Sequence, residues 1–86
     1  SPFPGTYMEL EDGRKFKVFD VDYVEDENID NTVEPGDILL MSKDSLYIRC
    51  TQGYVMINQI QPENSRRMDI KAFMAGNRLN MMDKFI

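Results

Sequence analysis

The chain has 86 residues, of which 42% are hydrophobic and 29% charged, and its net charge is −5. This length gives room for one small domain over residues 1–86, and the acidity argues against a generic nucleic-acid-binding domain, because such domains are usually basic. One cysteine and no histidine exclude an internal disulfide, a Cys/His zinc site and His-dependent catalysis within this chain. No apolar run approaches the ~18 residues of a membrane span and the start is not a signal peptide, so we expect a cytoplasmic protein.

The first quarter of the chain predicts two strands joined by a tight turn. Residues 7–11 alternate apolar and acidic side chains, Asp12-Gly13 is a strong hairpin signal, and residues 15–23 form the longest strand candidate. The apolar side chains change face after Val18, so we expect a β-bulge near Val18 that returns both sets to one side. The alternative is a strand buried on both faces.

The middle of the chain predicts a loop, a turn and a strand. Residues 25–34 are acidic and follow neither a helical nor a strand period, so we expect a solvated loop. They lack the ligand order and the glycine of a calcium loop, and we therefore predict no metal site. Pro35-Gly36 predicts a type II turn. It leads into residues 38–41, an apolar run typical of a central strand.

Two further strands are predicted at residues 46–50 and 54–61, where apolar and polar side chains alternate. Cys50 is expected to be a buried free thiol on the first of them. Tyr47 and Tyr54 are either outward-facing aromatics that can stack on bases or strand residues half covered by their neighbours.

One short amphipathic helix is predicted after a polar turn. Asp69 can cap its first turn, because a side-chain oxygen there accepts an unpaired backbone amide. Three apolar residues share one face at i, i+3, i+4 spacing, namely Ile70, Phe73 and Met74. Gly76 fits the left-handed position that commonly follows the last turn.

The residues after the helix are expected to complete the fold. Met81 and Met82 are expected to fill the core, the alternative being an apolar patch against a partner domain, and Phe85-Ile86 to form a last pairing segment. Five to six short antiparallel strands with tight turns and one helix favour an all-β barrel.

Three stretches of the sequence carry a resemblance to a known family. The run Q-I-Q-P-E-N-S-R-R-M at residues 59–68, followed by F-M-A-G at residues 73–76, resembles the signature of the C-terminal domain of methionyl-tRNA formyltransferase. S-P-F-P-G-T at residues 1–6 resembles the segment that joins this domain to its catalytic domain. Asn64-Ser65 stands where the family commonly has Gly-Lys, so one lysine of the pattern is absent. The resemblance covers essentially the whole chain.

The resemblance implies a small open Greek-key β-barrel similar to an OB-fold, without catalysis of its own. Such a domain assists the binding of initiator tRNA for the formylation of methionyl-tRNA in translation initiation. The chemistry and its donor, 10-formyltetrahydrofolate, belong to an N-terminal catalytic domain of the same chain, so we expect no cofactor in this domain. Because the chain begins at Ser1 rather than Met, we expect it to be excised from such a longer chain. The alternative is a structural appendage of a related formyltransferase that acts on an amino-sugar nucleotide or another non-tRNA substrate.

Binding, rather than catalysis, is therefore the predicted role. Residues 44–86 hold six bases and four acids, whereas residues 1–43 hold four bases and eleven acids. Basic side chains near the start of a helix can position phosphates. The alternative is that they solvate the helix or pair with Glu63 and Asp69. The candidate nucleic-acid-binding residues are Arg66, Arg67, Lys71, Arg78 and Arg49, with Lys84 as a possible neighbour.

Overall fold

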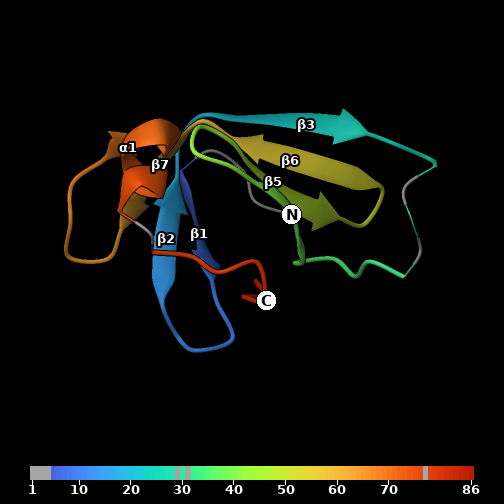
Figure 1. Cartoon of the computed structure of the whole chain (residues 1–86), viewed down its shortest axis with the longest axis horizontal. Helices are drawn as coiled ribbons and strands as arrows, with labels where there is room; N and C mark the ends of the chain where they lie inside the picture. Colours follow the sequence, from blue (N-terminus) through green and yellow to red (C-terminus); the bar gives the residue numbers. More distant parts are fainter. Residues whose placement is uncertain (1–4, 29, 31, 77) are drawn as a thin grey trace.

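The computed structural model describes residues 5–28, 30, 32–76 and 78–86. These residues form two four-stranded antiparallel sheets, with strand orders β1-β2-β7-β8 and β3-β6-β5-β4, and one short helix beside β7 (Figure 1). The elements are β1 (Thr6–Glu9), β2 (Lys15–Val18), β3 (Val21–Glu25), β4 (Ile38–Met41), β5 (Leu46–Cys50), β6 (Gly53–Ile57), β7 (Gln59–Pro62), β8 (Met68–Asp69) and α1 (Ile70–Ala75). The all-β class is confirmed, although the sheets do not close into a barrel.

The described residues form eight strands rather than five or six. Two predicted strands each divide in two where they turn a corner from one sheet to the other, and β8 is a short strand that was not predicted. The chain passes from β2 to β3 at Phe19 and Asp20, and from β6 to β7 at Asn58. Backbone hydrogen bonds join the two corners: Asn58 N–H donates to the carbonyl of Asp20 at 2.7 Å, and Phe19 N–H to that of Gln59 at 3.1 Å. The change of face after Val18 therefore marks a corner, and the predicted bulge there is wrong.

One cluster of buried apolar side chains draws on both sheets, the helix and the C-terminal segment. Its aromatic centre is Phe16 of β2, whose ring meets those of Phe73 and Phe85 edge-on at centroid distances of 5.5 and 6.2 Å. Edge-to-face packing adds to the free energy gained from burying these rings. Cys50 is a buried free thiol, as predicted.

The apolar run of β4 lies at the edge of its sheet, so the prediction of a central strand is wrong. Its register with β5 shifts between Ile38 and Leu40, and the Leu40 side chain is exposed. A bulge of this kind twists an edge strand and discourages pairing with other chains. The run is apolar because Ile38 reaches the core, not because both faces are covered.

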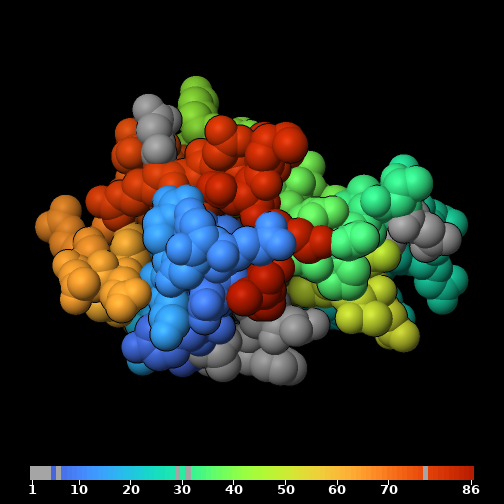
Figure 2. Space-filling model, turned by 90° about the horizontal axis from the view of Figure 1, so that it is seen from below, coloured from blue at the N-terminus to red at the C-terminus, as the bar shows by residue number. Residues whose placement is uncertain are grey.

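The C-terminal segment lies between the two sheets. Phe85 pairs with Leu10 after β1, and Lys84 pairs with Asp37 before β4. In Figure 2 this segment, in red, lies between the blue N-terminal hairpin and the green residues near β4. Gly36 makes room for it, since a Cβ there would overlap the carbonyl oxygen of Phe85. The predicted type II turn is confirmed by the positive φ of Gly36, +97°.

Met81 and Met82 do not fill the core, contrary to the prediction. Their exposed fractions are 47% and 89%. The backbone N–H of Asp83 donates to the carbonyl of Asn80 at 2.9 Å, and Asn80 Oδ1 accepts from the backbone N–H of Met82 at 2.9 Å. These bonds close a tight turn that places both methionines at its tip, away from the sheets.

Helix α1 begins where the sequence predicts. Asp69 Oδ1 accepts the backbone N–H of Ala72 at 2.8 Å, and the three predicted apolar residues are buried. Gly76 is right-handed (φ −81°), so the predicted left-handed position is wrong. A Cβ at this position would lie 3.1 Å from Nε of the exposed Arg78, which would have to shift slightly to make room for it.

Replacing Asp69 by alanine should lower the free energy of unfolding by about 1 kcal/mol, because the first-turn amide loses its acceptor. Urea-induced unfolding of the two proteins measures the difference. Asp69→Asn, which keeps a side-chain acceptor, should retain most of the stability. Equal losses for both variants would contradict the capping role.

Candidate nucleic-acid interface

The first sheet has one face in the core and one face in solvent. Met8 pairs with Phe16, and both are buried. The adjacent pair, Tyr7 and Lys17, lies on the opposite face, because successive side chains of a strand alternate. Lys17 in turn pairs with Gln61 of β7. Tyr7, Lys17 and Gln61 therefore follow one another across the outer face of the sheet.

Cations and aromatic rings alternate along this outer face. Lys17 Nζ lies 5.8 Å from the ring centroid of Tyr7 and 5.4 Å from that of Phe19. The guanidinium carbon of Arg67 lies 4.2 Å from the centroid of Phe19. All three distances are within the ~6 Å reach of a cation–π contact. We call Tyr7, Lys17, Phe19 and Arg67 the cation–aromatic row.

Arg67 is held in place by Gln59 of β7. Its Nε donates to Gln59 Oε1 at 2.9 Å, and Nη2 donates to the same oxygen. The guanidinium is thus fixed between an amide and the Phe19 ring, and within the described residues it forms no ion pair. A fixed guanidinium loses less conformational entropy when it binds a phosphate than a freely rotating one does.

The turn before Arg67 is also fixed. Gln61 Nε2 donates to the carbonyl of Ser65 at 2.9 Å. The backbone N–H of Ser65 donates to the carbonyl of Pro62 at 3.1 Å. Asn64 adopts φ +62°, a left-handed conformation that asparagine tolerates better than most residues. Arg66 and Arg67 follow this turn; Arg66 is exposed, and Arg67 reaches the outer face, where it contacts Gln59 and Phe19.

Three cations of this region are available to an anion. Lys17, Arg66 and Arg67 form no ion pair within the part of the chain that the structure describes. The alternative pairing of the two arginines with Glu63 or Asp69 is thus not seen among those residues. By contrast, Lys84 pairs with Glu34, and this hydrogen bond raises the pKa of the Lys84 amine. Lys84 is therefore occupied elsewhere.

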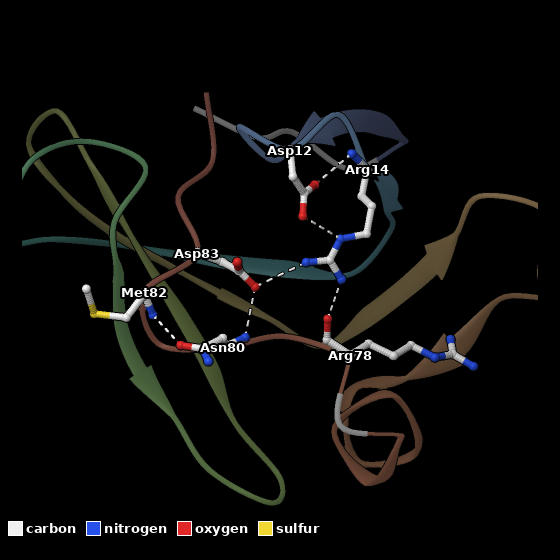
Figure 3. A network of polar contacts seen from close by, with 6 residues as sticks. All are labelled: Asp12, Arg14, Arg78, Asn80, Met82 and Asp83. Carbon is white, nitrogen blue, oxygen red and sulfur yellow. Dashed lines mark hydrogen bonds and ion pairs between the residues drawn. The ribbon is translucent and has the colours of Figure 1, made fainter.

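Arg14 is occupied as well, in a network that joins the β1–β2 turn to the C-terminal segment (Figure 3). Arg14 Nε lies 2.9 Å from Asp12, Nη2 lies 3.2 Å from Asp83, and Nη1 donates to the carbonyl of Arg78. The backbone N–H of Arg14 donates to Asp12 and lowers the pKa of that carboxyl below its usual value. Arg14 thus serves the fold rather than the interface.

Arg49 borders a hollow that Tyr7 of the cation–aromatic row also lines, whereas Lys71 lies elsewhere. Arg49 is 7% exposed, and its Nη1 donates to the carbonyls of Cys50, Thr51 and Gly53, so it stabilises the β5–β6 turn from inside. Its predicted role in nucleic-acid binding stays a prediction. Lys71 borders a shallow hollow together with residues 41–43 of the second sheet.

Arg78 is exposed and lies after the helix, with its guanidinium carbon 5.8 Å from the centroid of Phe73. It borders a hollow together with Lys15 and residues 62–65. This hollow adjoins the turn that carries Arg66, so Arg78 can extend the basic surface beyond the row.

Lys17, Phe19 and Tyr7 were not predicted as site residues. The signal for Lys17 was present, since the alternation of residues 15–18 places its side chain opposite the buried pair Phe16 and Val18. Phe19 was assigned to the core because the corner after Val18 was not predicted. Without that corner, the sequence could not bring Phe19 and Arg67 together.

Tyr47 and Tyr54 stack on each other in the second sheet, with centroids 5.3 Å apart and planes 9° apart. Both are half-buried, which favours their interpretation as strand residues covered by neighbours.

No helix among the described residues is long and apolar enough to cross a membrane.

Comparison with known proteins gives a family for this arrangement. The model of the formyl transferase C-terminal domain matches residues 1–78. Methionyl-tRNA formyltransferase of Lachnospira eligens is 33% identical over 81 residues, which cover 92% of this chain and 25% of that protein. The proteins of the same name from Geotalea daltonii and Nitratiruptor sp. are 35% and 36% identical, over 92% and 96% of this chain and 23% and 25% of their own length.

The chain thus spans about a quarter of the length of these relatives. The matched residues include both sheets, the helix and the complete cation–aromatic row. The chain belongs to the family of formyl transferase C-terminal domains.

Proposed function

We propose that this chain is the noncatalytic C-terminal domain of a methionyl-tRNA formyltransferase, where it helps to hold initiator tRNA beside an N-terminal catalytic domain of the same polypeptide. The observation that carries the proposal is the cation–aromatic row together with Arg66. It is a place on an acidic chain where cations free of ion pairs, within the described residues, alternate with aromatic rings. The names of the relatives support methionyl-tRNA as the substrate of the whole protein.

The division of charge gives this face its selectivity for a polyanion. The net charge of −5 opposes RNA binding at most orientations, because like charges repel at a distance of several ångströms. Contact is favoured where cations such as Lys17 and Arg67 face the phosphates. An acidic domain with one basic face therefore orients the RNA as well as binding it.

The formyl transfer itself is assigned to the catalytic domain. This chain has no histidine, and its carboxylates lie mostly in exposed positions rather than in a buried cleft. Binding energy from a remote domain still serves catalysis, since it positions the reacting end of the substrate.

A second function is favoured by the same negative charge. In a formyltransferase that acts on an amino-sugar nucleotide or another small substrate, the domain would only support the catalytic domain. RNA binding by the domain separates the two proposals, because a structural appendage needs no affinity for phosphates.

The test is the formylation of charged initiator tRNA by the full polypeptide that contains this domain. Replacing Arg66 and Arg67 by alanine should lower kcat/KM by at least about tenfold, because two charge-assisted phosphate contacts are lost. Most of the change should appear in KM, since the catalytic groups are untouched. Lys43→Ala removes an exposed charge from the second sheet and serves as the control. An unchanged kcat/KM in the double variant would refute the proposed tRNA role.

A further inference from the structure

We infer that the outer face of the first sheet binds an unpaired stretch of RNA, with one base stacked on Tyr7 and the flanking phosphates at Lys17 and Arg67. The inference rests on the proposed function, because it names the part of the RNA that the proposed interface recognises. Three observations carry it. Tyr7 is exposed, the ring of Phe19 is covered by Lys17 and Arg67, and Lys17 lies between the two rings.

Tyr7 is the exposed aromatic residue of the row, whereas Phe19 is half-buried. Tyr7 is 68% exposed on β1, an edge strand of the first sheet, and its ring stands beside a lysine amine. Exposed aromatic rings on sheet surfaces, flanked by cations, are what single-stranded nucleic acids stack on. Phe19 differs, because Lys17 and Arg67 both lie over its ring and it is half-buried. Phe19 therefore supports the cations, and Tyr7 is left to receive a base.

The spacing of the row suits a single strand. Lys17 Nζ is 5.8 Å from the Tyr7 centroid, so a phosphate that meets the amine is attached to a nucleotide whose base can reach the ring. In a duplex the base faces are covered by their neighbours, and an aromatic ring on a flat sheet cannot stack on them. A duplex would meet only the cations and would leave Tyr7 exposed.

Tyr23 shows that exposure alone is not the signal. It is 51% exposed on β3 of the second sheet. Its neighbours in the sequence are Asp22 and Val24, followed by the acidic residues Glu25 and Asp26. Tyr7 also has carboxylates nearby, those of Glu9 and Glu63. It differs in having Lys17 Nζ 5.8 Å from its ring centroid, whereas no cation of the described residues lies over the Tyr23 ring to meet a phosphate. Tyr23 is therefore the matched control for Tyr7.

The experiment measures the affinity of this 86-residue chain for three labelled RNAs by fluorescence anisotropy. They are an unstructured RNA of about ten nucleotides, within the ~4–16 nucleotides that one such domain covers, a fully paired duplex of the same length, and initiator tRNA. The proteins are the wild type, Tyr7→Ala, Tyr7→Phe and Tyr23→Ala.

Tyr7→Ala should weaken binding of the unstructured RNA by about tenfold, whereas Tyr7→Phe and Tyr23→Ala should stay within about twofold of the wild type. Duplex binding should be weaker and insensitive to Tyr7. The inference fails, while the proposed tRNA role stands, if tRNA and duplex bind but the unstructured RNA does not. It also fails if Tyr7→Ala and Tyr23→Ala have the same affinity for the unstructured RNA. If no RNA binds, both fail. If Tyr7→Ala changes only the association with a separately produced catalytic domain, the face is a protein interface and the inference fails.

Discussion

Replacing Gly36 by alanine is expected to lower the free energy of unfolding by about 3 kcal/mol or more. The left-handed φ of +97° costs a residue with a Cβ about 1–3 kcal/mol. The added Cβ would also overlap the carbonyl oxygen of Phe85 and lie 3.0 Å from its carbonyl carbon. The C-terminal segment must therefore move, and the buried Phe85 ring loses part of its packing against Phe16.

Gly13 provides the matched control for this effect. Its φ of +95° is nearly the same, but among the described residues nothing lies within 4 Å of the position of its Cβ. Gly13→Ala should therefore show only the backbone cost, about 1–2 kcal/mol. Urea-induced unfolding of the three proteins measures the difference. Equal destabilisation at the two glycines would show that the C-terminal segment does not pack against Gly36 as described.

The second large effect is expected at the cation–aromatic row. Replacing Lys17 and Arg67 by alanine should weaken the binding of initiator tRNA by about 10- to 100-fold, because two charge-assisted contacts to phosphate are removed. Both side chains lie on the solvent face, so the stability of the domain should change by less than about 1 kcal/mol. Equilibrium titration gives the affinity, and circular dichroism verifies the fold of the variant.

Gln59 offers a way to separate charge from position. Gln59→Ala keeps both cations but removes the amide that fixes the Arg67 guanidinium. The affinity for tRNA should fall by less than in the double variant, because the charge of Arg67 remains and only the fixed position of its guanidinium is lost. A loss as large as that of the double variant would mean that Gln59 contacts the RNA itself.

Local rules predicted the parts of the fold that depend on neighbours in the sequence. The hairpin at Asp12-Gly13, the turn at Gly36 and the cap at Asp69 each follow from one or two residues whose backbone preferences are strong. The family signature at residues 59–68 predicted membership, and the comparison confirmed it.

The errors arose where distant segments decide the outcome. The corner at Phe19 requires Gln59 and Asn58 as partners, and these lie about forty residues away in the sequence. The edge position of β4 depends on which strand β5 pairs with on its other side. The apolar pattern shows a change of face after Val18, but it identifies neither the partners of the corner nor the strand order of the second sheet.

The candidate site was predicted in part. Arg66 and Arg67 were found from the family signature, and the structure adds the partners that give Arg67 its position. A charged side chain on a strand is usually exposed, which favours a surface position for Arg49. The structure buries it instead, with Nη1 donating to carbonyls of the β5–β6 turn, and a strand pattern cannot reveal such partners.

The central claim, that an acidic domain binds RNA through one basic face, is tested most directly by the salt dependence of binding. The affinity of this chain for initiator tRNA is measured over a series of salt concentrations, for the wild type and for the variant that lacks Lys17 and Arg67. The logarithm of the association constant should fall linearly with the logarithm of salt concentration, and the slope of the variant should be smaller by about 1.4–1.8, since each phosphate contact contributes roughly 0.7–0.9. Equal slopes in the two proteins, or binding that does not depend on salt, would contradict the assignment of this face.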